Sequence, residues 1–281
     1  MIQIKDIDEA FIYYNIDNKY KERCYQCANK INSNVLLLEA FNKINNILNY
    51  EDYYKVKDIW KNMDINELFC NDIDPFITNL IILLSYKANQ ECIKKYKLDI
   101  EQITINKKRI KEAFESDLIN RHYSFVRISQ MLWAFNFVRV KIIEIGRLQY
   151  QIFDKETVKI HIPRGSKLDI NKVIESIKLS KIKLKEIYKI DNTKYICNSW
   201  LLSNKLNELI NKESNIHKFY ELFDVEDGNN CNNDLLNFVY QVKYIDDYNK
   251  LEENTTLQRI IKKELLQGTI FKIGNGTLKK I

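Results

Sequence analysis

Residues that interrupt secondary structure are scarce: the 281-residue chain has only 2 prolines and 6 glycines. Because both residues mark the turns of many-stranded folds, their scarcity favours long helices and argues against an all-β sandwich. Apolar residues make up 45% and charged residues 29%. This balance is typical of a globular chain and excludes disordered, collagenous and low-complexity scaffolds. The length allows one large domain or two of moderate size, each with its own core.

A long apolar run is also missing. The longest, Phe76 to Leu84, is interrupted by Thr78 and Asn79 and falls far short of the roughly 20 residues that cross a membrane. Acidic residues occupy the N-terminus, where a signal peptide needs a basic start and an apolar core. We therefore expect a cytoplasmic protein that does not enter membranes.

Several catalytic motifs are absent as well: the Walker loop, the GxSxG elbow, HExxH, the kinase set and the dinucleotide fingerprint. The six cysteines are expected to be reduced thiols in a chain without secretory features. Cys24 and Cys27 have CxxC spacing, but no second CxxC or His-rich segment follows. They fit one face of a helix better than a zinc or redox site, so we predict no metal.

The first half of the chain is helical in pattern from about residue 17 to residue 137. Apolar residues recur at spacings of three and four. Asp74 and Pro75 have the N-cap and first-turn character of a helix start. Helices are predicted at residues 34–48, 74–97, 106–120 and 123–137. Residues 1–139 are therefore predicted to form an α-helical domain.

Alternating strands replace this pattern near residue 140. Residues 147–153 and 157–162 alternate with period two and are joined by a short polar segment, as in a hairpin. If one face of this hairpin is apolar and faces the core, strand geometry gathers polar side chains on the other face. These are Arg147, Gln149, Gln151, Lys159 and His161. That polar face is then either exposed to solvent or the wall of a cleft.

The rest of the second half mixes helices and strands. A helix capped by Asp169 or Ser166 is predicted to run to about Ile187. Beyond it we predict a strand at 194–202, helices at 203–210 and 214–223, a loop at 227–230, a strand at 238–244, a helix at 255–267 and a strand at 269–273. Residues 140–281 therefore form a predicted α/β domain.

The segment from His161 to Asp169 carries the strongest chemical indication. Here a strand ends, the chain turns through Gly165 and a helix begins. Such a junction presents backbone N–H groups and the positive end of a helix dipole, which suits a phosphate group. Arg164 and Lys167 would add positive charge. The alternative is a plain tight turn into a capped helix.

Five sequence blocks resemble the recurring segments of a bacterial family of acyltransferase-domain proteins. They are Gly146-Arg-Leu-Gln-Tyr-Gln151, His161-Ile-Pro-Arg-Gly165, Asn198-Ser-Trp-Leu-Leu202, Ser214-Asn-Ile216 with Phe219, and Leu257-Gln-Arg259. In that family a helical N-acyltransferase N-terminal domain precedes a domain similar to the GNAT superfamily of N-acetyltransferases. The resemblance implies a GNAT-like second domain that uses acetyl-CoA or another acyl-CoA.

Cofactor-binding residues follow from this resemblance. In GNAT enzymes a strand and its following helix hold the cofactor diphosphate, and a splayed strand holds the pantetheine arm. The implied cofactor-binding residues are Arg164, Gly165, Ser166 and Lys167. The glycine-rich Gln/Arg-x-x-Gly-x-Gly/Ala string of the superfamily is absent here.

Acyl transfer to an amine needs a base for the amine and an acid for the thiolate that leaves. His161 is the candidate base, because its ordinary pKa is near neutrality and it lies on the polar face. Tyr220 is the candidate acid. Arg147, Gln149 and Gln151 are candidate substrate-binding residues. Asn198 and Ser199 either line the same cleft or bond a neighbouring loop.

The sequence thus predicts a two-domain protein that transfers an acyl group from acyl-CoA to a small-molecule or peptide amine. The alternative is a catalytically silent GNAT-like module that binds a ligand or another protein. A net charge of +6 and a lysine-rich helix at 172–189 permit an anionic ligand. Nucleic acid is not expected, because an apolar stripe dilutes the lysines and no aromatic residues interleave with them. Oligomeric state is left open.

Overall fold

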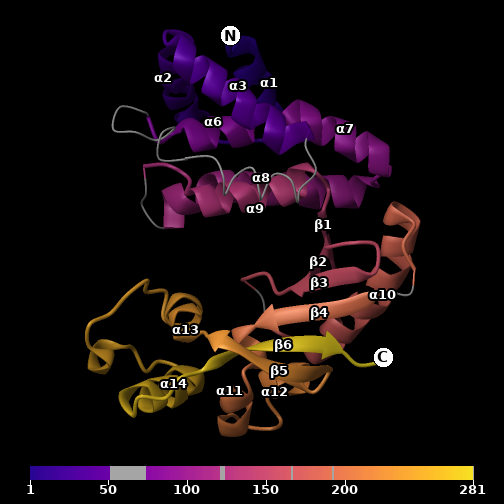
Figure 1. Cartoon of the computed structure of the whole chain (residues 1–281), viewed down its shortest axis with the longest axis vertical. Coiled ribbons are helices and arrows are strands. Elements are labelled where there is room, and N and C mark those ends of the chain that lie inside the picture. Colours follow the sequence, from indigo (N-terminus) through magenta and orange to yellow (C-terminus); the bar gives the residue numbers. More distant parts are fainter. Residues whose placement is uncertain (51–73, 121–123, 166, 192, 281) are drawn as a thin grey trace. The chain divides into compact units, whose positions relative to one another are not determined.

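The chain folds into two compact units, Met1–Ile143 and Glu144–Ile281. The computed structural model describes residues 1–50, 74–120, 124–165, 167–191 and 193–280 (Figure 1). Ser166, a predicted cofactor-binding residue, lies outside these ranges, as does the start of the helix predicted at 123–137. Each unit has its own core, so we describe the two separately.

The first unit is helical, as predicted. Its α-helices in the described ranges are α1 (Ile4–Tyr14), α2 (Lys21–Asn32), α3 (Val35–Tyr50), α6 (Ile77–Leu84), α7 (Tyr86–Tyr96), α8 (Ile100–Asn120) and α9 (Ile128–Val138). Aromatic rings tie these helices together. The ring of Phe114 meets Phe11, Tyr20 and Phe76 edge to face at centroid distances of 5.8 to 6.5 Å.

Buried polar side chains fix the helix ends of this unit. The predicted helix at 74–97 is in fact two helices, α6 and α7, which meet at Ser85. The Ser85 hydroxyl donates to the carbonyl of Ile82 at 2.5 Å, a local bond that competes with continued helix. The Asn89 and Asn106 amides donate to the carbonyls of Val138 and Phe137, at 2.9 and 2.7 Å. These bonds satisfy carbonyls that the C-terminal end of α9 leaves without helical partners.

The second unit is a mixed α/β domain, again as predicted. Its sheet contains β1 (Ile142–Ile145), β2 (Leu148–Ile152), β3 (Thr157–His161), β4 (Lys194–Ser199), β5 (Phe223–Asn230) and β6 (Lys272–Leu278). The strand order is β1-β2-β3-β4-β6-β5 (Figure 1). β3 and β4 are parallel, whereas the pairs β2–β3, β4–β6 and β5–β6 are antiparallel. The helices are α10 (Ile170–Tyr188), α11 (Asn204–Leu209), α12 (Asn215–Tyr220), α13 (Asn232–Val239) and α14 (Thr256–Leu266).

Three local predictions in this unit were wrong. Residues 227–230, predicted as a loop, continue β5, where Asp227 pairs with Gly274 before a bulge. The predicted strand at 238–244 begins within α13 instead, because Leu235 and Leu236 turn an apolar helix face into a local core. The last strand is β6, later and longer than the predicted 269–273. A strand at β1 was not predicted at all.

Helix α10 packs closely on one face of the sheet. The Tyr150 and Ser176 hydroxyls lie 2.8 Å apart, and Ser180 donates to the Tyr195 hydroxyl at 3.3 Å. Gly146 has φ +57°, and a Cβ there would lie 3.4 Å from the Ser176 Cβ. A glycine at the β1–β2 turn thus satisfies the backbone and lets α10 approach.

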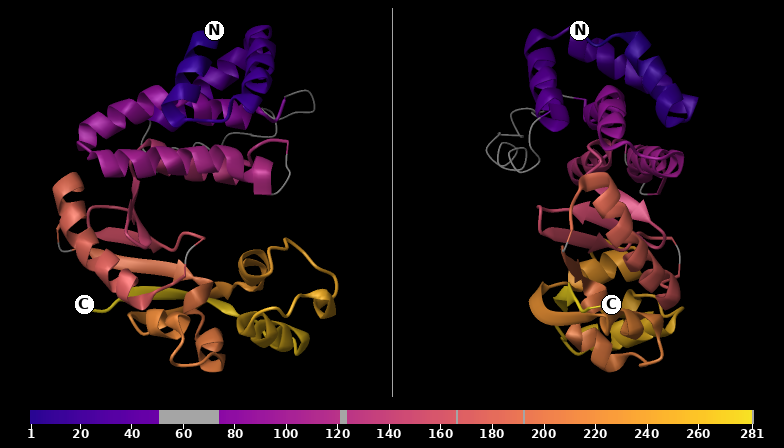
Figure 2. Two further views of the ribbon diagram at one scale, coloured as in Figure 1. Left: turned by 180° about the vertical axis from the view of Figure 1, so that it is seen from behind. Right: turned by 90° about the vertical axis from the view of Figure 1, so that its right-hand side faces the viewer.

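A smaller core joins α13, α14 and the short 3₁₀ helix η3 (Tyr248–Lys250). Leu235, Ile261, Leu265 and Phe271 are almost fully buried in it. Thr255 and Gln258 form a capping box at the start of α14. Figure 2 shows α13 and α14 grouped at one end of the strands, away from the bulk of α10.

Candidate active site

The sheet opens where β3 and β4 end. These parallel strands pair over Thr157–Lys159 and Lys194–Ile196. Beyond this stretch β3 continues to His161, while residues 196–199 of β4 pair with β6 on the other side. The carboxyl ends of β3 and β4 therefore diverge. Diverging strands leave backbone N–H and C=O groups that an extended ligand can bond.

One face of the sheet at this opening is polar. Gln149 stands directly opposite His161, and Gln151 opposite Lys159. Side chains alternate along a strand and directly paired residues share a face, so all four lie together. Asn198 of β4 and Asn275 of β6 lie on the same face by the same register. We call these six residues the polar face: Gln149, Gln151, Lys159, His161, Asn198 and Asn275.

The polar face is covered over β2. Gln149 and Gln151 are only 5% and 7% exposed. Of the two interpretations of this face, a solvent-exposed surface is therefore wrong at these two positions. Buried amides need partners. Gln149 Nε2 donates to Glu144 Oε2 at 2.7 Å, and Gln151 Oε1 lies 2.9 Å from His161 Nε2. Asn198, in contrast, is exposed and donates to Asn275 Oδ1 at 2.6 Å.

His161 is held as a neutral imidazole. Burial and, as a smaller cause, the nearby positive charge of Lys159 together lower its pKa to about 4. With Gln151 Oε1 as the acceptor of this contact, the tautomer that fits it carries the ring proton on His161 Nε2. Nδ1 is then the acceptor nitrogen of the ring. This is the protonation state that a general base requires.

The loop between β3 and α10 lies next to this opening in sequence. Gly165 has φ +103°, a conformation that favours glycine, and a Cβ there would meet nothing within 4 Å. Arg164 and Lys167 on either side are exposed. Arg164 Nη2 donates to the carbonyl of Asn237 at 3.1 Å, and its guanidinium lies 4.4 Å from the ring centroid of Phe238. The loop is thus positively charged and connected to α13.

Arg147, expected to bind substrate, contacts this loop. Its Nε donates to the carbonyl of Lys167 at 3.0 Å, and its Nη1 donates to the carbonyl of Pro163 at 3.1 Å. The side chain is 8% exposed. Burial lowers the pKa of Arg147, yet a guanidinium stays charged at neutral pH.

The first turn of α10 already has an acceptor. Asp169, one of the two predicted caps, accepts from the backbone N–H groups of Asn171 and Lys172 at 2.9 and 3.2 Å. A carboxylate in this place repels a second anion. The loop before Asp169 is therefore the better place for a phosphate than the helix terminus itself.

Tyr220 and Ser199 lie away from the polar face. Ser199 caps the short 3₁₀ helix η2 (Trp200–Leu202), and its hydroxyl accepts from the N–H of Leu201 at 3.2 Å. Tyr220 donates to Asn204 Oδ1 at 2.8 Å, and Asn204 in turn donates to Asp227. The β5–β6 register puts Asp227 on the α10 side of the sheet. The structure thus brings together His161, Gln149, Gln151 and Asn198, but not Tyr220.

Glu144 and Asn275 join the site although sequence reasoning missed both. Glu144 alternates with isoleucines in β1, the strand that was not predicted. Asn275 lies between Gly274 and Gly276, and a Cβ on Gly274 would lie 2.0 Å from the carbonyl oxygen of Leu202. That Gly-Asn-Gly string was the available signal, because glycine within a strand marks close backbone approach.

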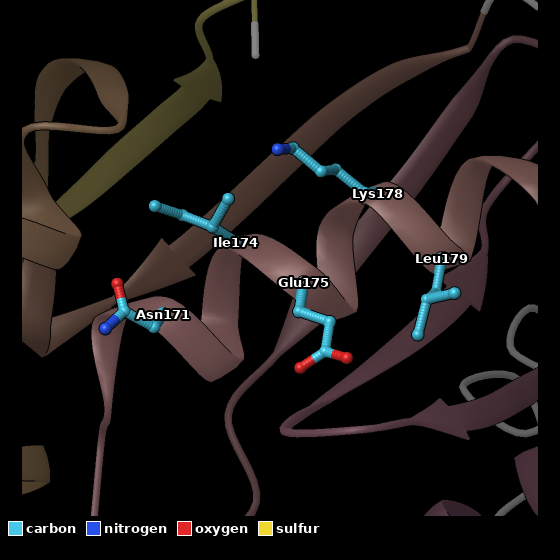
Figure 3. Close-up of a pocket in the computed structure, with 5 residues that line it drawn as sticks. All are labelled: Asn171, Ile174, Glu175, Lys178 and Leu179. Carbon is cyan, nitrogen blue, oxygen red and sulfur yellow. The ribbon is translucent and has the colours of Figure 1, made fainter.

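A depression on α10 is separate from these residues. The described residues that line it are Asn171, Ile174, Glu175, Lys178 and Leu179, all from this one helix (Figure 3). Ligand sites usually draw walls from several elements and include converging polar groups. None of the predicted site residues takes part, so we do not assign the reaction to it.

The described residues contain no group of three His, Cys, Asp or Glu side chains that could hold a metal ion. Cys24 and Cys27 are buried in α2, and burial raises the pKa of both thiols to about 12. Across the described ranges, the helices are too short or too polar to span a membrane.

Comparison with known families assigns the second unit. Residues 142–278 match the family model described as the GNAT-like C-terminal domain. This confirms the resemblance and the predicted fold class for that half of the chain. No curated protein matches the sequence.

Solved structures of acyltransferases share the fold. An acyltransferase in complex with decanoyl-CoA is 18% identical, with a TM-score of 0.64 over 74% of this chain and 66% of its own. An acyltransferase in complex with decanoyl-CoA and teicoplanin is also 18% identical, with a TM-score of 0.63 over 73% of this chain and 66% of its own. A mutant acyltransferase with octanoyl-CoA is 14% identical, with a TM-score of 0.73 over 99% of this chain and 88% of its own. The present chain therefore spans just under two thirds of the first two proteins.

Proposed function

We propose that this chain, whose residues 142–278 form a GNAT-like C-terminal domain, is an acyl-CoA-dependent N-acyltransferase. One observation carries the proposal: a half-buried His161, whose pKa is lowered to about 4, stands at the point where β3 and β4 diverge. The fold that this chain shares with acyltransferases in complex with decanoyl-CoA and octanoyl-CoA supports it. The acyl group is acetyl or a longer chain.

The residues around the opening fit an acyl-CoA by their chemistry. Arg164 and Lys167 supply positive charge beside Gly165, which suits the diphosphate. The backbone of β3 after Lys159 is not paired with β4, so it can bond the amides of a pantetheine arm. An acyl thioester at the end of that arm then reaches His161 and Asn198.

Proton transfer in the proposed reaction runs through His161. The amine nitrogen attacks the thioester carbonyl carbon, and as the C–N bond forms its N–H becomes acidic. His161 Nδ1 takes that proton. The C–S bond then breaks and the imidazolium returns the proton to the thiolate, which yields an amide and a thiol. A pKa of about 4 makes the imidazolium a strong acid for this second transfer.

Gln151 and Gln149 have supporting roles in this proposal. Gln151 fixes the ring orientation of His161 through Nε2. Gln149 is fixed in turn by Glu144. Tyr220 is not the acid in this proposal, because its hydroxyl donates to Asn204, which bonds Asp227 on the α10 side of the sheet.

The acceptor in this proposal is a small-molecule or peptide amine. Teicoplanin is present with decanoyl-CoA in one acyltransferase of the same fold, which supports an acceptor of this kind. The exposed Asn198–Asn275 pair is the open side of the polar face. We expect the acceptor to approach from there.

Calorimetric titration with acetyl-CoA and octanoyl-CoA tests the cofactor site. The variant Gly165→Val strains the loop backbone, because valine disfavours φ +103°. Gly268→Val is its matched control, because Gly268 also has a positive φ and open space around it. Saturable binding that Gly165→Val loses and Gly268→Val keeps would support the proposal. Incubation of the acyl-CoA complex with amines, followed by mass spectrometry, then tests transfer.

A second candidate function rests on Asp169. Its carboxylate occupies the N-terminal N–H groups of α10, and the glycine-rich string of GNAT enzymes is absent. Both features favour a catalytically silent GNAT-like module. Failure of every acyl-CoA to bind the wild-type protein would support this second function and refute the first.

A further inference from the structure

One side chain from another part of the sheet bonds the β3–α10 loop at two points. Arg147 follows the β1–β2 turn, 16 residues before Pro163 and 20 before Lys167. Its guanidinium bonds a carbonyl two residues before Gly165 and another two residues after it. One planar group therefore bonds carbonyls on both sides of Gly165.

The position of Arg147 is itself determined. Gly146 precedes it with φ +57°, and a Cβ at Gly146 would lie 3.4 Å from the Ser176 Cβ. The Ser176 hydroxyl also bonds the carbonyl of Ile145. The turn that carries Arg147 is therefore anchored on α10, the helix that the loop leads into. A rigid support makes the two loop contacts specific.

These bonds determine which way the loop backbone points. No cis peptide bond is found in the described residues. In a trans peptide unit the N–H points opposite to the C=O. Because the carbonyls of Pro163 and Lys167 point at Arg147, the N–H groups of Arg164 and Leu168 point to the opposite side. N–H groups that point away from Arg147, beside the positive side chains of Arg164 and Lys167, suit an anion.

We propose that Arg147 is a positioning residue that holds the β3–α10 loop in the conformation that binds the acyl-CoA diphosphate. The inference rests on the proposed acyl-CoA function. It reassigns Arg147, which the sequence suggested for substrate binding, from direct contact with a ligand to action through the loop. It also explains why glycine and arginine stand together at positions 146 and 147. Gly146 adopts the positive φ of the turn, and Arg147 extends from the turn to the loop carbonyls.

Affinity for two thioesters separates this role from a purely structural one. Octanoyl-CoA carries the diphosphate, whereas octanoyl-pantetheine lacks it but keeps the thioester and the pantetheine arm. We compare the wild type with Arg147→Lys, which keeps the charge but loses the planar two-donor geometry. Arg147→Gln removes the charge, and Arg259→Lys on the exposed surface of α14 is the matched control.

We expect Arg147→Lys to weaken octanoyl-CoA binding at least tenfold and octanoyl-pantetheine binding less than twofold, measured by calorimetry at up to millimolar ligand. Arg147→Gln should have the same selective effect, and Arg259→Lys should have none. Affinity of the wild type for octanoyl-CoA should also fall with added salt, more steeply than that of Arg147→Gln.

Two results would overturn the inference. Equal weakening of both thioesters would show that Arg147 only supports the fold, and unchanged octanoyl-CoA binding in a folded Arg147→Lys variant would show no role at all. Failure of the proposed function is distinguishable, because then the wild-type protein would not bind octanoyl-CoA, and the inference would fall with it. Circular dichroism checks that each variant is folded.

Discussion

The protonation of His161 offers the sharpest test of the site. Its pKa is lowered from 6.5 to about 4 in the folded protein by burial. Because the folded state resists protonation, stability is fully present above about pH 6.5 and is lost as the pH falls towards 4. The difference between the two pKa values lowers the free energy of unfolding by about 2 kcal/mol between pH 7 and pH 4.5. His161→Gln cannot be protonated and should not show this loss.

Urea unfolding at pH 7 and pH 4.5 measures this difference. The wild type should lose about 2 kcal/mol more unfolding free energy than His161→Gln over that interval, since the other titrating groups are common to both. A proton NMR titration checks the pKa directly, because the resonance missing in His161→Gln identifies His161. A His161 that titrates between pH 6 and 7, with equal acid losses in both proteins, would refute a buried neutral imidazole and the base assigned to it.

Three further predictions test the fold and the site. Gly274→Ala should destabilise the second unit by about 3 kcal/mol or more, because its Cβ would lie 2.0 Å from the Leu202 carbonyl; urea unfolding with a midpoint like that of the wild type would contradict this. Gln151→Leu should reduce the rate of acyl transfer at least tenfold, since the ring loses its orienting partner; an unchanged rate would remove that role. Cys24 and Cys27 should resist a thiol reagent at pH 8 in the folded protein and react in urea, because burial raises both pKa values to about 12; rapid reaction of the native thiols would count against their burial.

Local patterns were sufficient for the main elements. The α10 stripe and its Asp169 cap, the β2–β3 hairpin and the α14 capping sequence each arise from residues close together in the chain. Periodicity and capping act over three or four residues, so a single sequence reveals them. The break at Ser85 was missed because it depends on a side-chain bond to the Ile82 carbonyl. The extension of β5 through Asp227 was missed because it depends on pairing with the distant Gly274.

The site was predicted only in part. Parity along β2 and β3 correctly grouped Gln149, Gln151 and His161 on one face, because strand alternation is a local rule. Parity gave no information on burial, and both glutamines are nearly inaccessible to solvent. Tyr220 was selected from chain order alone, and the structure puts its hydroxyl beside Asn204.

The sequence by itself determined the two kinds of domain, the hairpin with its polar residues and the turn at Gly165, since all depend on near neighbours in the chain. Only the tertiary structure decided that β3 and β4 diverge beside His161 and that Arg147 bonds the carbonyls of Pro163 and Lys167. These features join residues 16 to 37 positions apart. The physical reason is that such contacts depend on strand order and register, which the packing of the whole unit fixes.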